Sequence, residues 1–309
     1  MDQLKHLISL KEFDGKWMQD CIDLAIDTKK NPEAYKDKMK NKTLIMLFQK
    51  ASTRTRTSFE AGATQLGGHA IFIDWRTTQL DKASLADEAK CLARYGDIIM
   101  ARVKKNEHMY ELANNSRVPV INGCDDMYHP CQSLGDIMTI QEHLGPVKGK
   151  KLVYFGINNN VSNTLSLAAA KLGMKFVLCC PDKDRDAIDR DLHGLLEKSG
   201  NYEEISDPKE AIMNADVIYT DTWVNMEFFN DPAFAEEKDR RIRTFMPYQL
   251  NKELHSNAPH ALIMHDLPAH VGYEITRDMI DHERSIIFDQ AENRMHIQKA
   301  IMLKLLDLA

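Results

Sequence analysis

Short apolar runs alternate with amphipathic stretches along almost the whole chain, and this alternation constrains the fold more than any other feature. The apolar runs predict strands at 43–48, 69–74, 97–102, 118–122, 151–156, 175–181, 216–222, 261–267 and 285–288. The amphipathic stretches predict helices at 15–28, 55–66, 84–95, 132–144, 161–172, 187–199 and 292–307. Strands that alternate with helices are typical of parallel sheets covered by helices, so we expect an α/β fold.

The length of the chain and one internal break predict two domains. A chain of 309 residues suits two domains better than one. Residues 145–150 read Gly-Pro-Val-Lys-Gly-Lys, a turn-rich basic segment between two similar strand–helix halves. We therefore expect two doubly wound domains, each with a central, mainly parallel sheet flanked by helices.

Composition excludes several classes of function. The formal net charge of −6 argues against a nucleic-acid partner, which would require a basic face. Residues 1–14 lack a continuous apolar stretch, and the longest apolar runs are far too short to cross a membrane. We expect a soluble, cytoplasmic protein that has no membrane partner. No CxxC pair or zinc-finger spacing occurs, so we expect no metal and reduced thiols at Cys21, Cys91, Cys124, Cys131, Cys179 and Cys180.

The predicted strand ends carry the candidate chemistry, because doubly wound sheets bind ligands beyond the carboxyl ends of their strands. After strand 43–48, hydroxyls and arginines coincide with a helix start at Ser52, Thr53 and Arg54. Free backbone N–H groups and the positive end of the helix dipole favour phosphate at such a position. The alternative interpretation is an N-capped surface helix with solvated arginines.

Other predicted strand ends carry further polar residues, each with a structural alternative. Arg102 ends one strand, and His129 and Gln132 follow the next as candidate partners of a carbonyl group. Three amides at 158–160 are candidates for a helix cap or for a carboxylate and ammonium site. Further candidates are Asp221, the His265-Asp266 pair and Arg294. Together these residues describe a crevice for a phosphate compound and a zwitterionic amine.

Two motifs in this order resemble the aspartate/ornithine carbamoyltransferase family. They are Ser52-Thr53-Arg54-Thr55-Arg56 and His129-Pro130-Cys131-Gln132. The segments at 221–224, 248–251, 265–268 and 288–294 favour the ornithine branch of that family. The resemblance extends from about residue 43 to about residue 306.

The resemblance implies an organisation and a reaction. Residues 1–145 plus 290–309 would form a carbamoyl phosphate-binding domain, and residues 146–289 would bind the amino acid. The protein would be a homotrimer or an assembly of trimers with sites between subunits, so that Gln79 would reach a neighbour's phosphate. The reaction is transfer of the carbamoyl group to the side-chain amine of L-ornithine, giving L-citrulline and phosphate. No cofactor or metal is needed.

The resemblance also assigns roles to individual residues. The carbamoyl phosphate-binding set is Ser52, Thr53, Arg54, Thr55, Gln79, Arg102, His129, Gln132, Leu267 and Arg294. The amino-acid-binding set is Asn160, Asp221, Asn225 and Met226. The catalytic set is Arg102, His129, Asp221, Asp266 and Arg294. Preorganised donors of this kind stabilise the charge that develops on a carbonyl oxygen.

Three departures from the family pattern leave the acceptor open. The family's Ser-Met-Gly reads Asn225-Met226-Glu227, its His-Cys-Leu-Pro has Asp266 in place of Cys, and its Gly-Asp-Gly reads Gly-Ile-Asn at 156–158. A second carboxylate beside Asp221 would stabilise an ammonium group and raise its pKa. The alternatives to ornithine are lysine, putrescine or an acylated ornithine, or a scaffold without turnover. The proton acceptor, which is either phosphate or a nearby acid, also remains open.

Overall fold

The chain folds into two compact units, and the computed structural model describes residues 5–80, 82–226 and 228–309. The first unit comprises the described residues up to Met138 together with Glu292–Ala309, and the second unit is Thr139–Ala291. These boundaries lie within or beside helices α6 (Pro130–Leu144) and α13 (Ile287–Leu305). The predicted boundaries at 145/146 and 289/290 lie a few residues away from them and stay a prediction.

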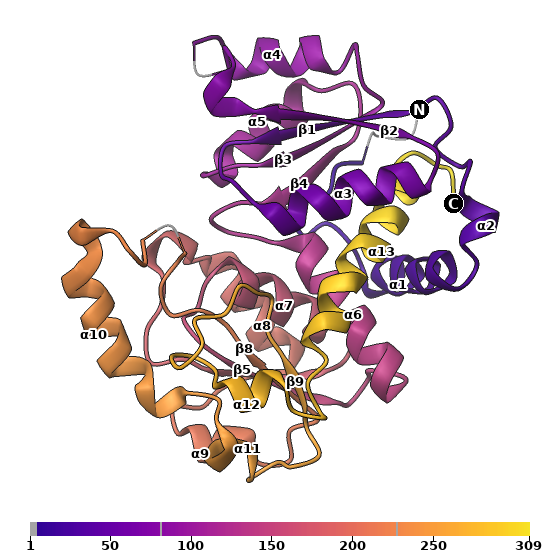
Figure 1. The fold of residues 1–309 in the computed structure, drawn as a ribbon. Helices are drawn as coiled ribbons and strands as arrows, with labels where there is room; N and C mark the ends of the chain where they lie inside the picture. Colours follow the sequence, from indigo (N-terminus) through magenta and orange to yellow (C-terminus); the bar gives the residue numbers. More distant parts are fainter. Residues whose placement is uncertain (1–4, 81, 227) are drawn as a thin grey trace. The chain divides into compact units, whose positions relative to one another are not determined.

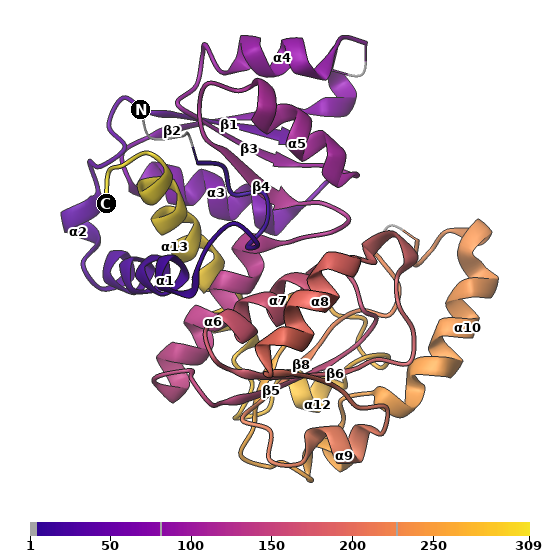
Figure 2. The same ribbon diagram turned by 180° about the vertical axis from the view of Figure 1, so that it is seen from behind.

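The first unit is built on a four-stranded parallel sheet in the order β2-β1-β3-β4. The strands are β1 (Thr43–Phe48), β2 (His69–Asp74), β3 (Ile98–Arg102) and β4 (Val120–Cys124). Helices α4 (Leu85–Leu92) and α5 (Asn106–Asn115) cover one face, and α1 (Gly15–Lys30), α3 (Thr53–Gln65) and α13 cover the other (Figures 1 and 2). The short elements are α2 (Pro32–Tyr35) and η1 (Trp75–Thr77).

Burial on both faces explains why these strands are continuous apolar runs rather than alternating ones. Ile45 and Leu47 of β1 pack into the cluster that contains Ala89 of α4 and Leu112 of α5. The alternate residues of β1 are also fully buried, on the opposite face of the sheet. A parallel sheet that is covered on both faces requires this kind of sequence.

The second unit contains a five-stranded parallel sheet in the order β7-β6-β5-β8-β9. Its strands are β5 (Lys151–Phe155), β6 (Lys175–Cys179), β7 (Tyr202–Glu204), β8 (Val217–Thr220) and β9 (Leu262–Met264). Helices α7 (Asn160–Lys171) and α8 (Arg190–Ser199) lie on one face (Figure 2). On the other face lie α9 (Pro208–Ile212), α11 (Lys252–His255) and α12 (Arg277–Ile280). The remaining elements of this unit are η2 (Arg185–Ala187), η3 (Pro232–Phe234), α10 (Ala235–Phe245) and η4 (Met246–Tyr248).

The predicted fold class of two parallel-sheet units flanked by helices is confirmed. The strand predicted at 285–288 is wrong. Ser285 forms only one bridge, to Ile263, and helix α13 begins at Ile287. The two isoleucines at 286 and 287 gave that prediction, but they are the buried start of a helix whose first turn contains Asp289. The strand predicted at 118–122 lies at Val120–Cys124, and β7 was not predicted.

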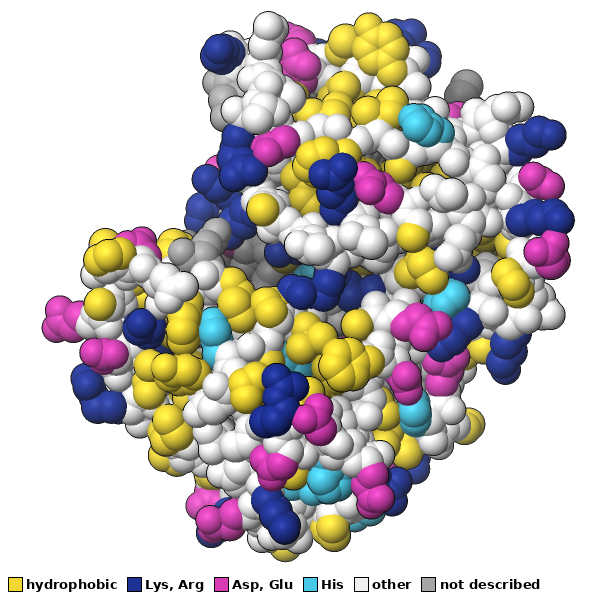
Figure 3. Space-filling model, viewed as in Figure 1, with side chains coloured by type: hydrophobic (Ala, Val, Ile, Leu, Met, Phe, Trp, Pro, Cys, Tyr) yellow, Lys and Arg dark blue, Asp and Glu magenta, His cyan; other side chains and the backbone are white. Residues whose placement is uncertain are grey.

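The surface of the described residues agrees with the mild acidity of the chain. Acidic and basic side chains are interspersed on the face shown in Figure 3. None of the described helices combines the length and the apolar character that a membrane span requires. All six cysteines are free thiols; four are buried, Cys91 is exposed and Cys180 is partly buried.

Candidate active site

The first predicted phosphate element is the N-terminus of α3, at the carboxyl end of β1. Ser52 is its N-cap, in an extended conformation, and its hydroxyl accepts a hydrogen bond from the Thr55 backbone N–H at 3.4 Å. The same hydroxyl donates to Thr55 Oγ1 at 3.0 Å. The Ser-Thr-Arg-Thr sequence therefore opens a helix whose first-turn donors and dipole suit an anion.

Two guanidinium groups converge on this helix start. Arg102 ends β3, which pairs with β1, and its Nη1 donates to Thr55 Oγ1 at 3.4 Å. Arg294 comes from α13, and its Nη2 donates to the same hydroxyl at 2.8 Å. Thr55 is fully buried and Arg294 nearly so. Two cations at one buried hydroxyl create a strongly positive site, which an anionic ligand would stabilise.

His129 lies beside these arginines, immediately before α6. It is only 4% exposed. Burial, followed by the positive charges of Arg294 and Arg102, holds the pKa of His129 well below its usual value. The imidazole is therefore neutral at physiological pH, and a neutral ring keeps one N–H, which can donate to a carbonyl oxygen.

Gln132, in the first turn of α6, has a fixed amide orientation. Its Nε2 donates to Asp136 Oδ1 at 2.8 Å, and an ionised carboxylate can only accept, so the NH₂ group must face Asp136. The opposite atom, Oε1, is buried and accepts no hydrogen bond from any described residue. A buried acceptor without a donor is costly, so this oxygen is available to an N–H donor on a ligand.

In the second unit, Asp221 follows β8 and is the centre of a hydrogen-bond cluster. Tyr154 Oη and Asn159 Nδ2 donate to its Oδ2 at 2.9 and 2.8 Å, and the Thr222 N–H donates to Oδ1 at 2.6 Å. The side chain is 3% exposed. Burial, followed by the charge of Asp266, raises the pKa of Asp221 to about 7. This carboxyl can therefore gain or lose a proton near neutral pH.

Asp266 belongs to a second group of titratable side chains at the end of β9. Its neighbour His265 is fully buried. The Nδ1 atom of His265 lies 3.5 Å from Asp266 Oδ1, and its Nε2 atom lies 3.1 Å from Glu274 Oε1. Burial opposes a charge on His265, whereas the carboxylates of Asp266 and Glu274 favour one, so the two effects on its pKa oppose each other. The Leu267 N–H points at Nδ1 from 2.8 Å, which requires a lone pair there, so we assign the neutral ring with its proton on Nε2.

Sequence reasoning missed Tyr154 and Glu274 of the amine cluster, and it named Asn159 only as one of three candidate amides. Asn159 contacts Asp221, whereas the predicted Asn160 is the first residue of α7. Tyr154 was hidden in a strand, and its phenol points to the carboxyl edge of the sheet, where it meets Asp221. Glu274 is fully buried and also accepts from the His270 N–H at 2.6 Å. An acid eight positions after Asp266 in an apolar context was the only available signal.

The structure leaves some predicted residues outside these clusters. Asn225 and Met226 are exposed in the loop after β8, and Glu227 lies outside the described residues. Gln79 is exposed in the loop between η1 and α4, and its side chain makes no hydrogen bond with the described phosphate-cluster residues. Leu267 follows Asp266 with a φ of 55°, an unusual conformation for a branched residue, which the His265 contact holds.

Within the described ranges, no group of three or more histidine, cysteine or acidic side chains could hold a metal ion. The first unit offers an anion cluster with a neutral imidazole and an amide oxygen. The second unit offers a buried carboxyl, paired with another acid, for a cationic amine. The sequence assigned these two sets to a phosphate half and an amine half of one site, and that assignment stays a prediction.

Comparisons with known proteins agree with this chemistry. Residues 5–142 match the family model described as aspartate/ornithine carbamoyltransferase, carbamoyl-P binding domain, and residues 148–305 match that of its Asp/Orn binding domain. An ornithine carbamoyltransferase from Archaeoglobus fulgidus is 42% identical over 309 residues, covering 98% of both chains. One from Pyrococcus furiosus, named anabolic, is 46% identical over 269 residues, covering 85% of this chain and 84% of its own.

A solved structure shares the fold over nearly the whole chain. The ornithine carbamoyltransferase from Pyrococcus furiosus superposes with a TM-score of 0.90 at 39% identity, covering 97% of this chain and 96% of its own. The similarity therefore extends over both units.

Proposed function

Since the chain belongs to the aspartate/ornithine carbamoyltransferase family, we propose that it transfers the carbamoyl group of carbamoyl phosphate to the side-chain amine of L-ornithine, giving L-citrulline and phosphate. The observation that carries this proposal is the buried group in the first unit. Two arginines meet at the start of α3, beside a neutral imidazole and an amide oxygen that lacks a donor. Carbamoyl phosphate offers a dianion, a carbonyl oxygen and an NH₂ group, one partner for each.

On the carbamoyl side, each residue has a distinct task. Ser52, Thr53, Arg54 and Thr55 hold the phosphate at the helix start. Arg102 and Arg294 neutralise its charge, and Gln79 contributes from a neighbouring subunit. The neutral His129 donates to the carbonyl oxygen, where negative charge develops as the amine attacks, and Gln132 accepts from the carbamoyl NH₂. Because the Gln132 amide is already fixed by Asp136, this binding requires no reorganisation.

On the amine side, ornithine arrives as an ammonium ion and must lose a proton before it attacks. Asp221, whose pKa is raised to about 7, is a better proton acceptor than an ordinary aspartate. We assign it the role of receiving that proton, with Asp266 as the second carboxylate of the pair. The free amine then attacks the carbamoyl carbon, the bond from carbon to the phosphate oxygen breaks, and the departing phosphate takes the second proton that the amine loses. Asn160, Asn225 and Met226 complete the amino-acid site, and Leu267 the carbamoyl site.

The proposal also includes the assembly. We place the enzyme in the cytoplasm as a homotrimer, alone or within a larger assembly of trimers. Mixing a Gln79→Ala variant with an Arg294→Ala variant tests the shared site. In a hybrid trimer, some sites would take Arg294 from one subunit and Gln79 from its neighbour, so both residues would be present there. Recovery of activity on mixing supports sites between subunits. No recovery, with hybrids verified by mass spectrometry, would contradict them.

The test of the proposed function is a steady-state assay of phosphate release from carbamoyl phosphate. Four acceptors are compared: ornithine, lysine, putrescine and N-acetylornithine. We expect kcat/KM for ornithine to exceed the others by at least about 100-fold, because an α-carboxylate, an α-amine and a chain of one length must all be matched. A faster reaction with another amine would assign Asp266, Asn225 and the residue at 227 to acceptor specificity and change the substrate.

Replacement of Asp266 by the cysteine of the family separates the two interpretations of this departure. Asp266→Cys removes a negative charge beside Asp221, so the pKa of Asp221 should fall. The acidic limb of the pH profile of kcat/KM for ornithine should move to lower pH by about one unit. An unchanged profile would show that the proton acceptor is not Asp221.

A further inference from the structure

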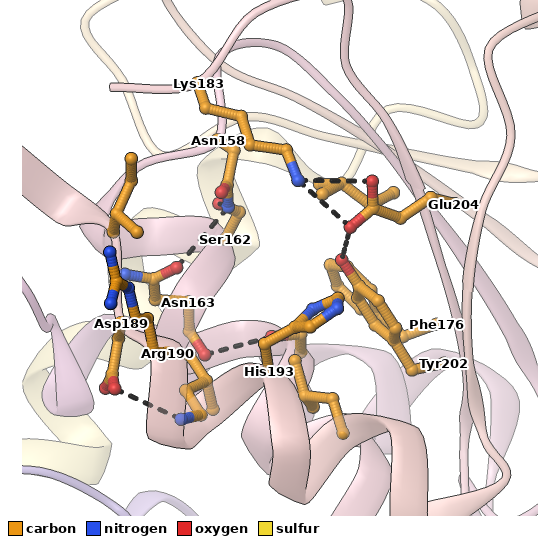
Figure 4. Close-up of a pocket in the computed structure, with 15 residues that line it drawn as sticks. Asn158, Ser162, Asn163, Phe176, Lys183, Asp189, Arg190, His193, Tyr202 and Glu204 are labelled. Atoms are coloured by element: carbon orange, nitrogen blue, oxygen red, sulfur yellow. Dashed lines mark hydrogen bonds and ion pairs between the residues drawn. The ribbon is translucent and has the colours of Figure 1, made fainter. Parts of the chain in front are cut away.

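A cavity of about 270 Å³ lies in the second unit, apart from the residues of the amine cluster. It is enclosed by α7, α8 and the strands β6 and β7 (Figure 4). The space between helices and a parallel sheet is normally filled by apolar side chains. Here α7 instead lines the cavity with the small polar residues Ser162, Asn163 and Ser166, all buried.

One wall of the cavity is flat and aromatic. The rings of Phe176 and Tyr202 are stacked at 6.2 Å with an interplanar angle of 8°, and His193 meets Tyr202 edge-on at 6.1 Å. Leu178 of β6 and Leu192 of α8 continue the apolar surface. A planar ring would bury one face against this wall. The volume suits one or two rings and is too small for a dinucleotide.

One of the charged groups at the mouth has no partner among the described residues. Lys183 is paired with Glu204, which also accepts from the Tyr202 hydroxyl at 2.8 Å. Asp189 is the N-cap of α8 and accepts from the Leu192 N–H at 3.1 Å. Arg190 is exposed, and its side chain makes no hydrogen bond or ion pair with any described residue. The charge that remains to attract a ligand is therefore the guanidinium of Arg190.

The cavity is connected to the amine cluster through the capping box that opens α7. Asn158 Nδ2 donates to Ser162 Oγ at 2.8 Å, and the Asn159 N–H donates to the same oxygen at 2.9 Å. Asn159 in turn caps the helix and donates to Asp221 at 2.8 Å. Asn158 and Ser162 line the cavity in Figure 4, so two hydrogen bonds separate its wall from Asp221.

We propose that this cavity binds a small aromatic carboxylate and that its occupancy strengthens amino-acid binding at the Asp221 cluster. The ring lies against Phe176 and Tyr202, and the carboxylate pairs with Arg190. A ligand packed on Asn158 and Ser162 holds the capping box in the arrangement that presents Asn159 to Asp221. The coupling rests on the proposed function, whereas the binding does not.

The binding is tested by calorimetry with indole-3-carboxylate as the probe, in the presence of saturating inorganic phosphate to occupy the phosphate cluster. Indole lacks the charge and acetate lacks the ring, so both should bind at least about 10-fold more weakly. Arg190→Gln removes the charge and Ser166→Leu fills the cavity. Each should weaken probe binding at least about 10-fold, whereas Arg243→Gln, an exposed arginine of α10, should not.

The coupling is tested in the steady-state assay. Saturating probe should lower the KM for ornithine at least about two-fold and leave the KM for carbamoyl phosphate unchanged, and ornithine should tighten probe binding by the same factor. Probe binding without an effect on the ornithine KM would overturn the coupling. The site would be overturned if the probe did not bind, or if indole or acetate bound as tightly as the probe. Probe binding that neither cavity variant weakens would overturn it as well. Probe binding by a protein that lacks transferase activity would refute the proposed function alone.

Discussion

Asp221 carries a stability cost that its replacement should reveal. Its pKa is about 7, compared with 3.8 for an ordinary aspartate. Between these two pH values the folded protein holds a proton on Asp221 that the unfolded chain has already lost. Stability should therefore fall as pH rises from about 4 to about 7 and stay level above that. At about 1.4 kcal/mol per pH unit, the whole effect corresponds to about 4 kcal/mol.

The variant Asp221→Asn abolishes this titration. Asparagine has the shape of the protonated acid and, like it, carries donor hydrogens. Both therefore have fewer acceptor sites than a carboxylate for the groups of Tyr154, Asn159 and Thr222 that donate to this side chain. That mismatch adds a constant offset of about 1–3 kcal/mol and does not vary with pH. The free-energy difference between variant and parent should therefore grow in favour of the variant by about 3 kcal/mol between pH 5 and pH 8.

Urea unfolding of the second unit measures this difference. Trp223 lies two positions from Asp221 and is buried, so its fluorescence reports on this unit. Both proteins carry Trp17→Phe and Trp75→Phe, which makes Trp223 the only tryptophan. The matched control is Asp207→Asn, an exposed N-cap of α9 in the same unit, where asparagine also caps well. A difference for Asp221→Asn that stays constant from pH 5 to pH 8 would refute the raised pKa.

Three further replacements test other parts of the two clusters. Arg102→Gln should weaken carbamoyl phosphate binding about 10- to 100-fold in calorimetry, because one charge-assisted contact is lost. The control Arg56→Gln, on the outer face of α3, should change the dissociation constant by less than about two-fold. Gly156→Ala should lower the melting temperature and ornithine turnover together, because φ is 147° and a Cβ would lie 3.2 Å from the Asp221 carbonyl oxygen. Glu274→Leu should destabilise the protein by about 2–5 kcal/mol in urea unfolding, because the His265 ring N–H and the His270 backbone N–H lose their acceptor. Glu274→Gln keeps an acceptor oxygen and should restore most of that stability.

The sequence could predict the fold because the local pattern and the tertiary structure agree. Each strand of a parallel sheet covered on both faces must be a continuous apolar run, and β1 and β5 are such runs. The prediction at 285–288 was wrong because two adjacent isoleucines fit a strand and a buried helix start equally well. Short elements such as α9 and α12 lack the length for a periodic signal.

The candidate site could be predicted only in part. Residues such as Arg102 and Asp221 were visible because strand ends in this architecture face ligands. Tyr154 and Glu274 were not visible, because their roles depend on which distant side chain lies opposite them. Asn159 and Asn160 could not be distinguished, because which of two adjacent amides is the cap depends on the residue at which the helix begins.

The substitution of aspartate for cysteine at position 266 acquires a physical meaning from these contacts. Two ionised carboxylates in one buried site would repel each other, and a site of that kind holds a proton near neutral pH. Burial is the larger cause of the raised pKa of Asp221, and the charge of Asp266 adds to it. Once Asp221 has lost its proton, it can pair with an arriving ammonium ion and then accept the proton that this ion must lose. The departure therefore changes the pH at which the amine is activated rather than removing the means to activate it.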